Sequence, residues 1–207
     1  MKSPKQELVV ATRNKKKLRE IKQILRGLDL KITSLADYPA SPEIIENGRT
    51  FKANAAKKAV GIARFSGNLT LGEDSGLCVD ALAGRPGVYS ARFAGSRQDD
   101  EKNNLKLLGL LKNVSTGKRK AGYVCAVALA DKSGLIGVVE GSCRGRIGFT
   151  PKGRFGFGYD PLFVIPKYKK TFAQLGPKIK HKISHRFRAL QKAKRVLDKY
   201  IENQKQS

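Results

Sequence analysis

The sequence predicts an α/β domain built on a mixed sheet. Three observations predict it: helix-like and strand-like segments are interleaved, two consecutive apolar strands are joined by a short turn, and no internal repeat or low-complexity stretch breaks the pattern. A hairpin gives an antiparallel pair, whereas strands separated by helices favour parallel pairs, so both kinds are expected in one sheet. The 207 residues suffice for a single domain with a sizeable core.

The first half of the chain is expected to form a strand, two helices and a second strand. "ELVVAT" (7–12) has the composition of a short buried strand. The helix that follows has Asn14 as its expected N-cap and Gly27 near its end, and its apolar face repeats at Leu18, Ile21, Leu25 and Leu28. A second helix is expected from Thr50 to Phe65. "NLTLGED" (68–74) then predicts a strand that ends at two adjacent carboxylates, Glu73 and Asp74.

The second half is expected to contain a helix, a hairpin, a glycine-rich loop and a last helix. Asp99 and Asp100 suit the first turn of a helix through "LKLLGLL" (105–111). "RKAGYVCAVALA" (119–130) and "LIGVVEGSCRGRIG" (135–148) predict strands joined by "DKSG". After the loop "PKGRFGFGYDPLF" (151–163), helical spacing returns at Ile183, Phe187, Leu190, Leu197 and Ile201.

The charge is strongly positive and unevenly spread. The formal net charge is +25, and from Lys167 to Lys199 the only acid is Asp198. Nine of the 17 acidic residues lie between Asp37 and Glu101. A basic surface attracts polyanions such as nucleic acid, a membrane or phosphorylated metabolites, and it is also a solubilising face, so charge alone selects no partner.

Several protein classes are disfavoured. Three cysteines, Cys78, Cys125 and Cys143, form an odd set without CxxC spacing, which argues against a disulfide framework or a zinc site and for reduced core residues in a cytoplasmic protein. No apolar run approaches the roughly 18 residues of a membrane span. The first ten residues lack a signal-type apolar stretch.

Two clusters near the start of the chain have the residues for phosphate chemistry. In "ATRNKKKL" (11–18), a strand ends at Thr12 and opens a lysine-rich helix, so the helix N-terminus and Lys17 would attract an anion; an ordinary capped basic turn is the alternative. In "ENGRTFKANAAKKA" (46–59), Asn54 and Lys58 are four residues apart and share a helix face, and Glu46 precedes a turn. A plain polar helix face is the alternative there.

A third cluster is the carboxylate pair itself. Adjacent buried carboxylates are costly without a cation, and Mg2+ would relieve that cost. An Asx-type turn at Asp74 and Ser75 would explain Asp74 but not Glu73. The functional hypothesis has Glu46 and Asp74 bind Mg2+, with Glu73 as a further candidate ligand and one carboxylate accepting a proton from water.

A fourth cluster combines "FGFGYDP" (155–161) with "KHKISHRFRAL" (180–190). The glycines allow close approach to a ligand, and Phe157 or Tyr159 would stack on a flat ring, unless both aromatic side chains belong to the core. His185 and Arg186 would add hydrogen-bond donors. Together the four clusters supply what nucleoside triphosphate chemistry needs.

The chain resembles the inosine triphosphate pyrophosphatases, which remove deaminated purine nucleotides. The resemblance rests on "VVATRNKKKLREI", "ENGRTFKANAAKKA", "EDSGLCVDALAGRPGVYSARFAG", "FGFGYDPLF" and "ISHRFRAL", which occur in order over almost the whole chain. The chain departs from many bacterial relatives at Glu73, where they have Asp, and at Ala53, where they have Glu. The resemblance implies a homodimer, and a single domain whose elongated, bent mixed sheet carries two lobes that enclose the nucleotide.

The resemblance also implies a role for each matching residue. Asp74 is expected to be the proton acceptor, with Glu46 and Asp74 as the Mg2+ ligands. The residues expected to bind the triphosphate are Thr12, Arg13, Asn14, Lys15, Lys16 and Lys17, supported by Asn54, Lys58 and Ser75. Those expected at the sugar and base are Phe157, Gly158, Tyr159, Asp160, Lys180, His185 and Arg186.

The expected reaction is hydrolysis of ITP, dITP or XTP to the nucleoside monophosphate and pyrophosphate. Two other functions stay open. One is a basic nucleic-acid binding protein, which explains the charge but gives the acidic pair no purpose. The other is a Maf-type nucleotide pyrophosphatase, which shares the fold but acts on other bases.

Overall fold

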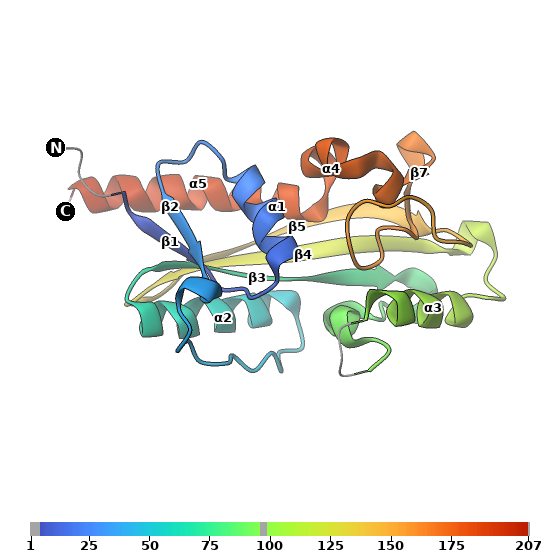
Figure 1. The fold of residues 1–207 in the computed structure, drawn as a ribbon, viewed down its shortest axis with the longest axis horizontal. Coiled ribbons are helices and arrows are strands. Elements are labelled where there is room, and N and C mark those ends of the chain that lie inside the picture. The colour runs from blue at the N-terminus through green and yellow to red at the C-terminus, as the bar shows by residue number, and fades with distance from the viewer. Residues whose placement is uncertain (1–4, 96–98, 207) are drawn as a thin grey trace. The chain divides into compact units, whose positions relative to one another are not determined.

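The computed structural model describes residues 5–95 and 99–206, and it has the expected mixed sheet (Figure 1). Seven strands lie in the order β2-β1-β3-β4-β5-β6-β7. Strand β1 pairs in parallel with β2 and β3, whereas β6 pairs antiparallel with β5 and β7. The strands are β1 (Glu7–Val10), β2 (Lys31–Ser34), β3 (Leu69–Val79), β4 (Lys120–Asp131), β5 (Gly134–Ile147), β6 (Phe163–Ile165) and β7 (Lys170–Thr171).

The helices begin where the sequence provides capping side chains. Asn14 caps α1, Thr50 caps α2 and Asp99 caps α3, each accepting hydrogen bonds from backbone N–H groups of the first turn. The helices are α1 (Lys15–Ile24), α2 (Phe51–Ser66), α3 (Asp100–Leu110), α4 (Phe172–Ile183) and α5 (His185–Gln206). Among the described residues, no helix is both long and apolar enough to cross a membrane.

The chain divides into two compact units, each with its own core. Within the described residues, unit 1 comprises the chain up to Asp74, then Cys125–Gly141, then the chain from Arg186 onward; unit 2 comprises Ser75–Val124 and Ser142–His185. Strands β3, β4 and β5 each contribute residues to both units.

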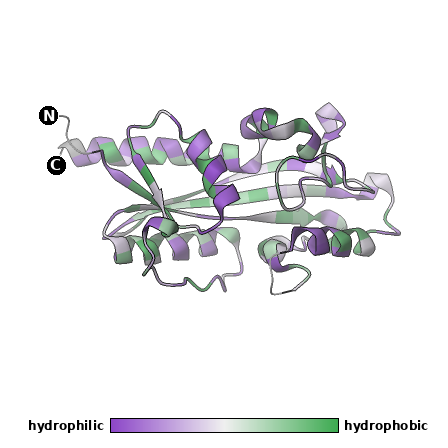
Figure 2. Ribbon diagram, viewed as in Figure 1, coloured by the Kyte–Doolittle hydropathy of each residue, from purple (hydrophilic) through white to green (hydrophobic). Residues whose placement is uncertain are grey.

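In unit 1 the alternation of β1 side chains places helices on both faces of the sheet. Leu8 and Val10 join a core with residues of α1 and α5, whereas Val9 and Ala11 join Ile62 of α2. Helices α1 and α5 therefore cover one face and α2 covers the other, as Figure 1 shows. In Figure 2 both α1 and α5 alternate between apolar and polar residues along their length, as expected for helices with one buried side.

The core of unit 2 includes four buried aromatic side chains, Tyr123, Tyr159, Phe163 and Phe172. Phe163 and Phe172 are fully buried, and Tyr123 packs against both rings. This core also includes Tyr159, which is 3% exposed. The glycine-rich loop 151–162 is therefore anchored to the core at one of its aromatic residues.

Two sequence-based expectations about these elements were wrong. Strand β3 does not end at the carboxylate pair but continues to Val79, so Asp74 and Ser75 lie in extended backbone instead of an Asx turn. The last helical segment is two helices, because α4 ends at Ile183 and α5 begins at His185. The short strands β2, β6 and β7 were not expected, since two to four residues leave little periodicity to detect.

Candidate functional site

The turn after β1 is tightly held by its own side chains. The Oδ1 atom of Asn14 accepts hydrogen bonds from the N–H groups of Lys16 (3.0 Å) and Lys17 (3.1 Å), and the N–H of Asn14 donates to Thr12 Oγ1. The Arg13 guanidinium donates to both the carbonyl and the hydroxyl of Ser41. Because Asn14 already occupies two N–H groups of the helix N-terminus, an anion bound here would depend mainly on lysine side chains.

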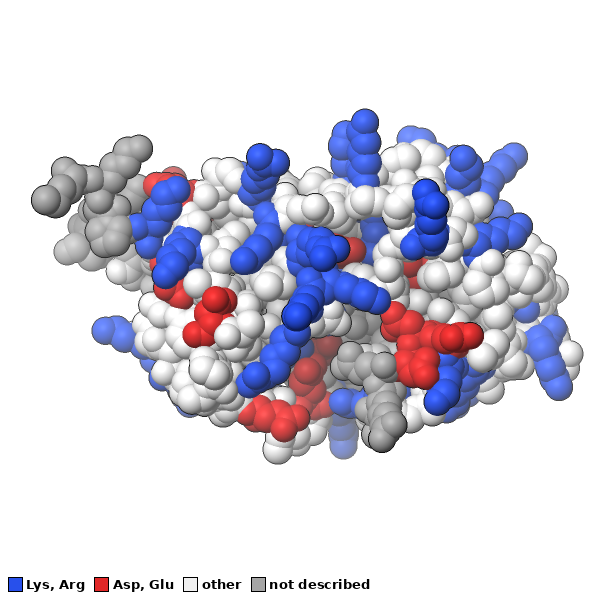
Figure 3. Space-filling view, in the orientation of Figure 1, with Lys and Arg blue, Asp and Glu red and all other residues white. Residues whose placement is uncertain are grey.

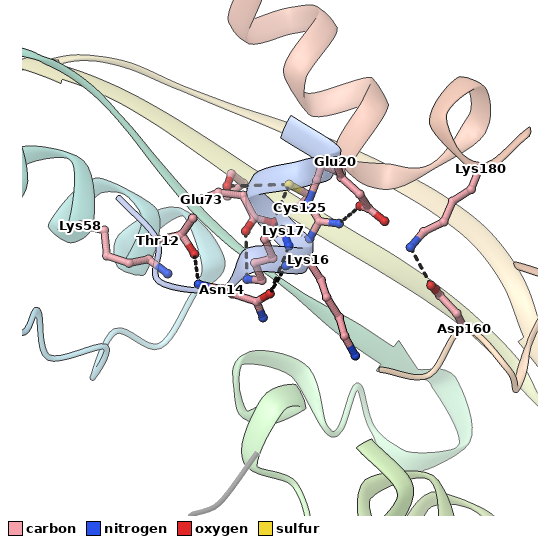
Figure 4. A network of polar contacts seen from close by, with 12 residues as sticks. Thr12, Asn14, Lys16, Lys17, Glu20, Lys58, Glu73, Cys125, Asp160 and Lys180 are labelled. Carbon is pink, nitrogen blue, oxygen red and sulfur yellow. Dashed lines mark hydrogen bonds and ion pairs between the residues drawn. The ribbon is translucent and has the colours of Figure 1, made fainter. Parts of the chain in front are cut away.

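Glu73 lies at the centre of a buried charge network in unit 1 (Figure 4). Lys17 Nζ is 2.9 Å from Glu73 Oε2, and an Arg186 Nη is 3.0 Å from Glu73 Oε1. The other Nη of Arg186 binds Glu20, and the Cys125 thiol donates to Glu73 Oε1 at 3.3 Å. We call these five residues, Lys17, Glu20, Glu73, Cys125 and Arg186, the charge network.

The charge network is balanced, with two carboxylates and two cations. Burial alone would lower the pKa of Lys17, but the neighbouring Glu73 and Asp74 reverse this and raise it. Burial and the Glu73 carboxylate raise the pKa of the Cys125 thiol well above its usual value, so this cysteine is a neutral hydrogen-bond donor. Both cations therefore stay charged at neutral pH, and each carboxylate oxygen of Glu73 pairs with one of them.

Asp74, the next residue along β3, has a different environment. The Asn54 side-chain amide donates to Asp74 Oδ2 at 3.0 Å, and Asn54 Oδ1 in turn accepts from the N–H of Gly48 at 2.7 Å. Burial raises the pKa of Asp74, and the cations Lys58 and Lys17 only partly oppose this shift. A buried carboxylate that an amide positions and whose pKa is raised has the properties of a general base.

A glycine brings Asn54 close enough to reach Asp74. A Cβ atom at Gly72 would lie 2.2 Å from the Ala55 carbonyl oxygen and 2.6 Å from the Ala59 nitrogen. Any other residue at this position would push α2 away from β3. Gly72 therefore allows the close approach of helix and strand on which the Asn54–Asp74 hydrogen bond depends.

Glu46 and Asp74 fit a hard cation, but Glu73 does not. Lys58 Nζ binds Glu46 at 2.8 Å and also lowers the pKa of Asp74, so one ammonium already attracts both carboxylates. Within residues 5–95 and 99–206, no group of three or more His, Cys, Asp or Glu side chains is arranged to bind a metal ion. Two carboxylates are nevertheless enough for Mg2+, which is commonly bound by one or two carboxylates together with substrate phosphates.

In unit 2, Asp160 organises the loop that was expected to contact the base. Its Oδ2 accepts from Lys180 Nζ at 2.6 Å and from the N–H of Phe157 at 3.0 Å. Lys180 Nζ also lies 4.7 Å from the centre of the Phe157 ring, within range of a cation–π interaction. A glycine is required at position 156, because its φ is +83° and a Cβ there would lie 2.0 Å from Asp160 Oδ2.

Helix α3 binds the same loop through both backbone groups of Gly158. The Gly158 N–H donates to Asp100 Oδ2 at 2.8 Å, and Asn104 Nδ2 donates to the Gly158 carbonyl at 3.0 Å. Asp100 and Asn104 are four residues apart and so lie on one helix face. The helix therefore holds the loop at Gly158, between the two aromatic residues Phe157 and Tyr159.

Tyr123 joins this loop to His185. The Tyr159 N–H donates to the Tyr123 hydroxyl at 3.1 Å, and the Tyr123 and His185 rings stack with centres 4.5 Å apart and planes 8° apart. Tyr159 donates its own hydroxyl to the Ser90 carbonyl at 2.8 Å, and burial raises its pKa. Tyr159 was expected either to stack on a ligand or to belong to the core, and the structure places it in the core.

The expected site residues thus fall into two groups, one in each unit. Apart from Ser75, unit 1 contains the residues expected at the triphosphate and the metal, together with Arg186, which was expected at the base. Unit 2 contains Ser75 and the loop residues with Lys180 and His185. Arg186 is 1% exposed and its terminal nitrogens bind two carboxylates, so its expected role as a reader of the purine edge stays a prediction.

Sequence reasoning missed several members of both groups, although weak signals were present. Glu20 is the only acid in the α1 segment "KKKLREIKQI", and Tyr123 is the only aromatic residue in β4. Asn104 belongs to an Asn-Asn pair one turn after Asp100. None of these sequence features shows which residue the side chain contacts, because each contact is made to a distant part of the chain: Glu20 to Arg186, Asn104 to Gly158 and Tyr123 to Tyr159.

Comparison with known proteins identifies the family. The sequence profile of the Ham1 family matches residues 8–196. A dITP/XTP pyrophosphatase of Desulforamulus reducens is 49% identical over 193 residues, which cover 93% of this chain and 96% of the relative, and one of Geobacter sulfurreducens is 49% identical over 183 residues, with coverages of 88% and 92%. Among solved structures, a HAM1 protein of Coxiella burnetii matches with a TM-score of 0.85 and 36% identity, covering 94% of this chain and 99% of the other. The resemblance expected from the sequence motifs is thus confirmed, and the chain belongs to the Ham1 family.

Proposed function

We propose that this chain hydrolyses deaminated purine nucleoside triphosphates, namely ITP, dITP and XTP, to the nucleoside monophosphate and pyrophosphate. Its relatives at 45–49% identity bear the name dITP/XTP pyrophosphatase, and the alignments extend over about nine tenths of the chain. The observation that carries the proposal is the contrast between two adjacent carboxylates: Glu73 pairs with the cations Lys17 and Arg186, whereas burial raises the pKa of Asp74, whose Oδ2 accepts a hydrogen bond from the Asn54 amide.

In the proposed reaction, Asp74 accepts a proton from the attacking water. The water oxygen forms a bond to the α-phosphorus, and the bond from that phosphorus to the α–β bridging oxygen breaks. The bridging oxygen leaves with the pyrophosphate and takes the electron pair. Asn54 holds Asp74 in position for this step, and Lys17 and Lys58 stabilise the negative charge of the triphosphate.

We propose Glu46 and Asp74 as the residues that would hold Mg2+. When bound, Mg2+ supplies positive charge to the phosphates and to the leaving pyrophosphate. Support comes from the donor chemistry, since both side chains are carboxylates that attract Lys58. Glu73 is withdrawn from the candidate ligands, because its two cations compete with any metal.

Recognition of the base is assigned to the loop in unit 2. Hypoxanthine and xanthine present an acceptor oxygen at the position where adenine presents an amino group, so a positioned cation favours the deaminated bases. Lys180, which is 3% exposed and binds Asp160, is the donor that we propose, and Phe157 is the ring that would stack on the base. That one nucleotide engages both this loop and the triphosphate residues stays a prediction.

Two properties implied by the family are carried here as proposals. The chain would be a homodimer, which light scattering of the purified protein tests directly. It would work in the cytoplasm, which fits its three free cysteines, Cys78, Cys125 and Cys143.

The position of bond cleavage tests the reaction. Hydrolysis of ITP in water enriched in heavy oxygen, followed by mass spectrometry of the products, should place the label in inosine monophosphate and not in pyrophosphate. Label in pyrophosphate would mean attack at the β-phosphorus, and release of inorganic phosphate with IDP would reject the proposed reaction altogether.

A further inference from the structure

Hydrolysis of a small nucleotide leaves one feature of the chain unexplained, the large excess of basic residues. The formal net charge is +25, and in Figure 3 Lys and Arg side chains are spread widely over the face drawn, whereas Asp and Glu side chains gather in a few places. Only some of these cations lie in the two groups of candidate site residues. The others are numerous enough to form a surface of their own.

In unit 1 exposed cations form a regular stripe on α5. Arg188, Lys192, Arg195 and Lys199 are all exposed and are spaced by four, three and four residues, so they lie on one side of the helix. The opposite side of α5 is buried in the core through Ala189, Leu190, Ala193 and Leu197. The stripe ends at Glu202, the next residue of the same spacing, which is exposed and acidic.

Helix α1 presents a similar stripe on the same face of the sheet. Arg19 and Lys22 are exposed on α1, and the exposed Arg26 follows one turn later. Helices α1 and α5 pack in one core cluster and are joined by the Glu20–Arg186 ion pair, so their exposed sides belong to one surface of unit 1. We call these seven residues, Arg19, Lys22, Arg26, Arg188, Lys192, Arg195 and Lys199, the basic face.

We propose that the basic face binds the phosphate backbone of a nucleic acid. Between Arg188 and Lys199 the helix rises about 16 Å, and each strand of a nucleic acid presents a phosphate roughly every 3.4 Å along its axis, so the stripe can follow several consecutive phosphates. A lone nucleotide or phosphate ion would use only one or two of these cations. The length and regularity of the stripe therefore favour a polymer.

The basic face is built for charge and not for base recognition. It includes no aromatic side chain on which a base could stack, so the binding is independent of sequence and depends steeply on salt. A helix that inserts into a membrane presents exposed apolar residues beside its cations, whereas the apolar side of α5 is buried in the core, so a membrane would be held only through its anionic headgroups. Lys192 Nζ donates to the Glu140 carbonyl at 2.8 Å, which fixes one cation of the stripe in place.

The test compares two variants of equal net charge. In the stripe variant, Arg188, Lys192, Arg195 and Lys199 are all changed to Gln. In the control variant, four exposed lysines of unit 2, Lys112, Lys118, Lys120 and Lys178, are changed to Gln. None of these eight residues belongs to the candidate site, so both variants should hydrolyse ITP as the wild type does.

Binding is measured by fluorescence anisotropy with a labelled oligothymidine strand and a labelled mixed-sequence duplex over a range of salt concentrations. We expect the wild type to bind both probes, the stripe variant to bind at least tenfold more weakly, and the control to stay within about twofold. Loss of four phosphate contacts should make the slope of log K against log salt shallower by about 3.

Three results would overturn the proposal. Equal weakening in the stripe and control variants would mean that only net charge matters. Binding to phosphatidylserine vesicles but to neither oligonucleotide would make the surface a membrane contact. Failure to bind either oligonucleotide, with a salt-dependent fall in kcat/KM for ITP in the stripe variant alone, would mean that the stripe attracts the substrate instead.

Discussion

Glu73→Gln and Asp74→Asn make the same chemical change at adjacent residues, and the structure predicts opposite consequences. Glu73 is 3% exposed and binds two cations, so the loss of its charge deprives both Lys17 and the buried Arg186 of this carboxylate. Asp74 has a pKa that burial raises, so its ionised form is disfavoured in the folded state. The first change should destabilise the fold, and the second should not.

The magnitudes follow from burial. Removal of one partner from a buried ion pair costs about 3–5 kcal/mol, so Glu73→Gln should lower the urea midpoint by about 1–2.5 M if the m-value is about 2–3 kcal/mol/M. For Asp74 the sign is reversed. A carboxyl whose folded pKa is raised contributes stability below its unfolded pKa and loses it as pH rises, so at neutral pH Asp74→Asn should leave the urea midpoint unchanged or raise it.

For catalytic activity, Asp74 is the residue whose substitution should have the larger effect. Asp74→Asn should fold normally and lose turnover, because an amide cannot accept a proton from water. Glu73→Gln combined with Lys17→Met should recover part of the stability lost by Glu73→Gln, because the unpaired ammonium is then removed as well. A loss below about 1 kcal/mol in Glu73→Gln, or near-normal turnover in Asp74→Asn, would refute these assignments.

Three further predictions concern other contacts. The Tyr38 hydroxyl, 2.6 Å from Glu7, holds the pKa of Glu7 below its ordinary value despite the opposing effect of burial. Glu7→Gln should therefore be less stable than the wild type at neutral pH, and this difference should vanish as pH falls below about 4. A stability difference that does not change with pH in urea titrations would contradict this. Gly156→Ala should raise the KM for ITP, because a Cβ at φ +83° collides with the Asp160 carboxylate, and an unchanged KM would show that the loop tolerates the shift. Asn104→Ala removes the donor to the Gly158 carbonyl and should raise KM with little change in kcat, whereas a lower kcat at constant KM would place Asn104 in the chemical step.

Local sequence patterns were sufficient for the elements that have several turns or a long apolar run. The cap Asn14, the apolar spacing in α1 and α2, and the β4–β5 hairpin lie where local rules place them. Thr50 and Asp99, expected inside the first turns of their helices, are the N-caps one residue earlier. The predicted strand ended too early, at Asp74 instead of Val79, because two charged residues followed by a glycine resemble a turn. Buried cations compensate the charge of Glu73, and such compensation over long sequence distances is invisible in a local window.

The site shows the same division. Asp74 and Asn54 belong to separate sequence clusters that were both expected at the site, and the structure joins them by a hydrogen bond. The ion pair between Glu73 and Arg186 could not be predicted, because the two residues are 113 positions apart and nothing in either segment specifies the pairing. Glu20 and Asn104 went unnoticed for the same reason, since each is ordinary until its partner is known.

The most direct test of the central claim is the rate of pyrophosphate release from ITP, XTP, GTP and ATP, each with and without Mg2+. The proposed function predicts Mg2+-dependent release that strongly favours ITP and XTP, and its loss in Asp74→Asn. Equal rates with ATP and GTP, or no release from any of the four nucleotides by a folded wild-type protein, would contradict it.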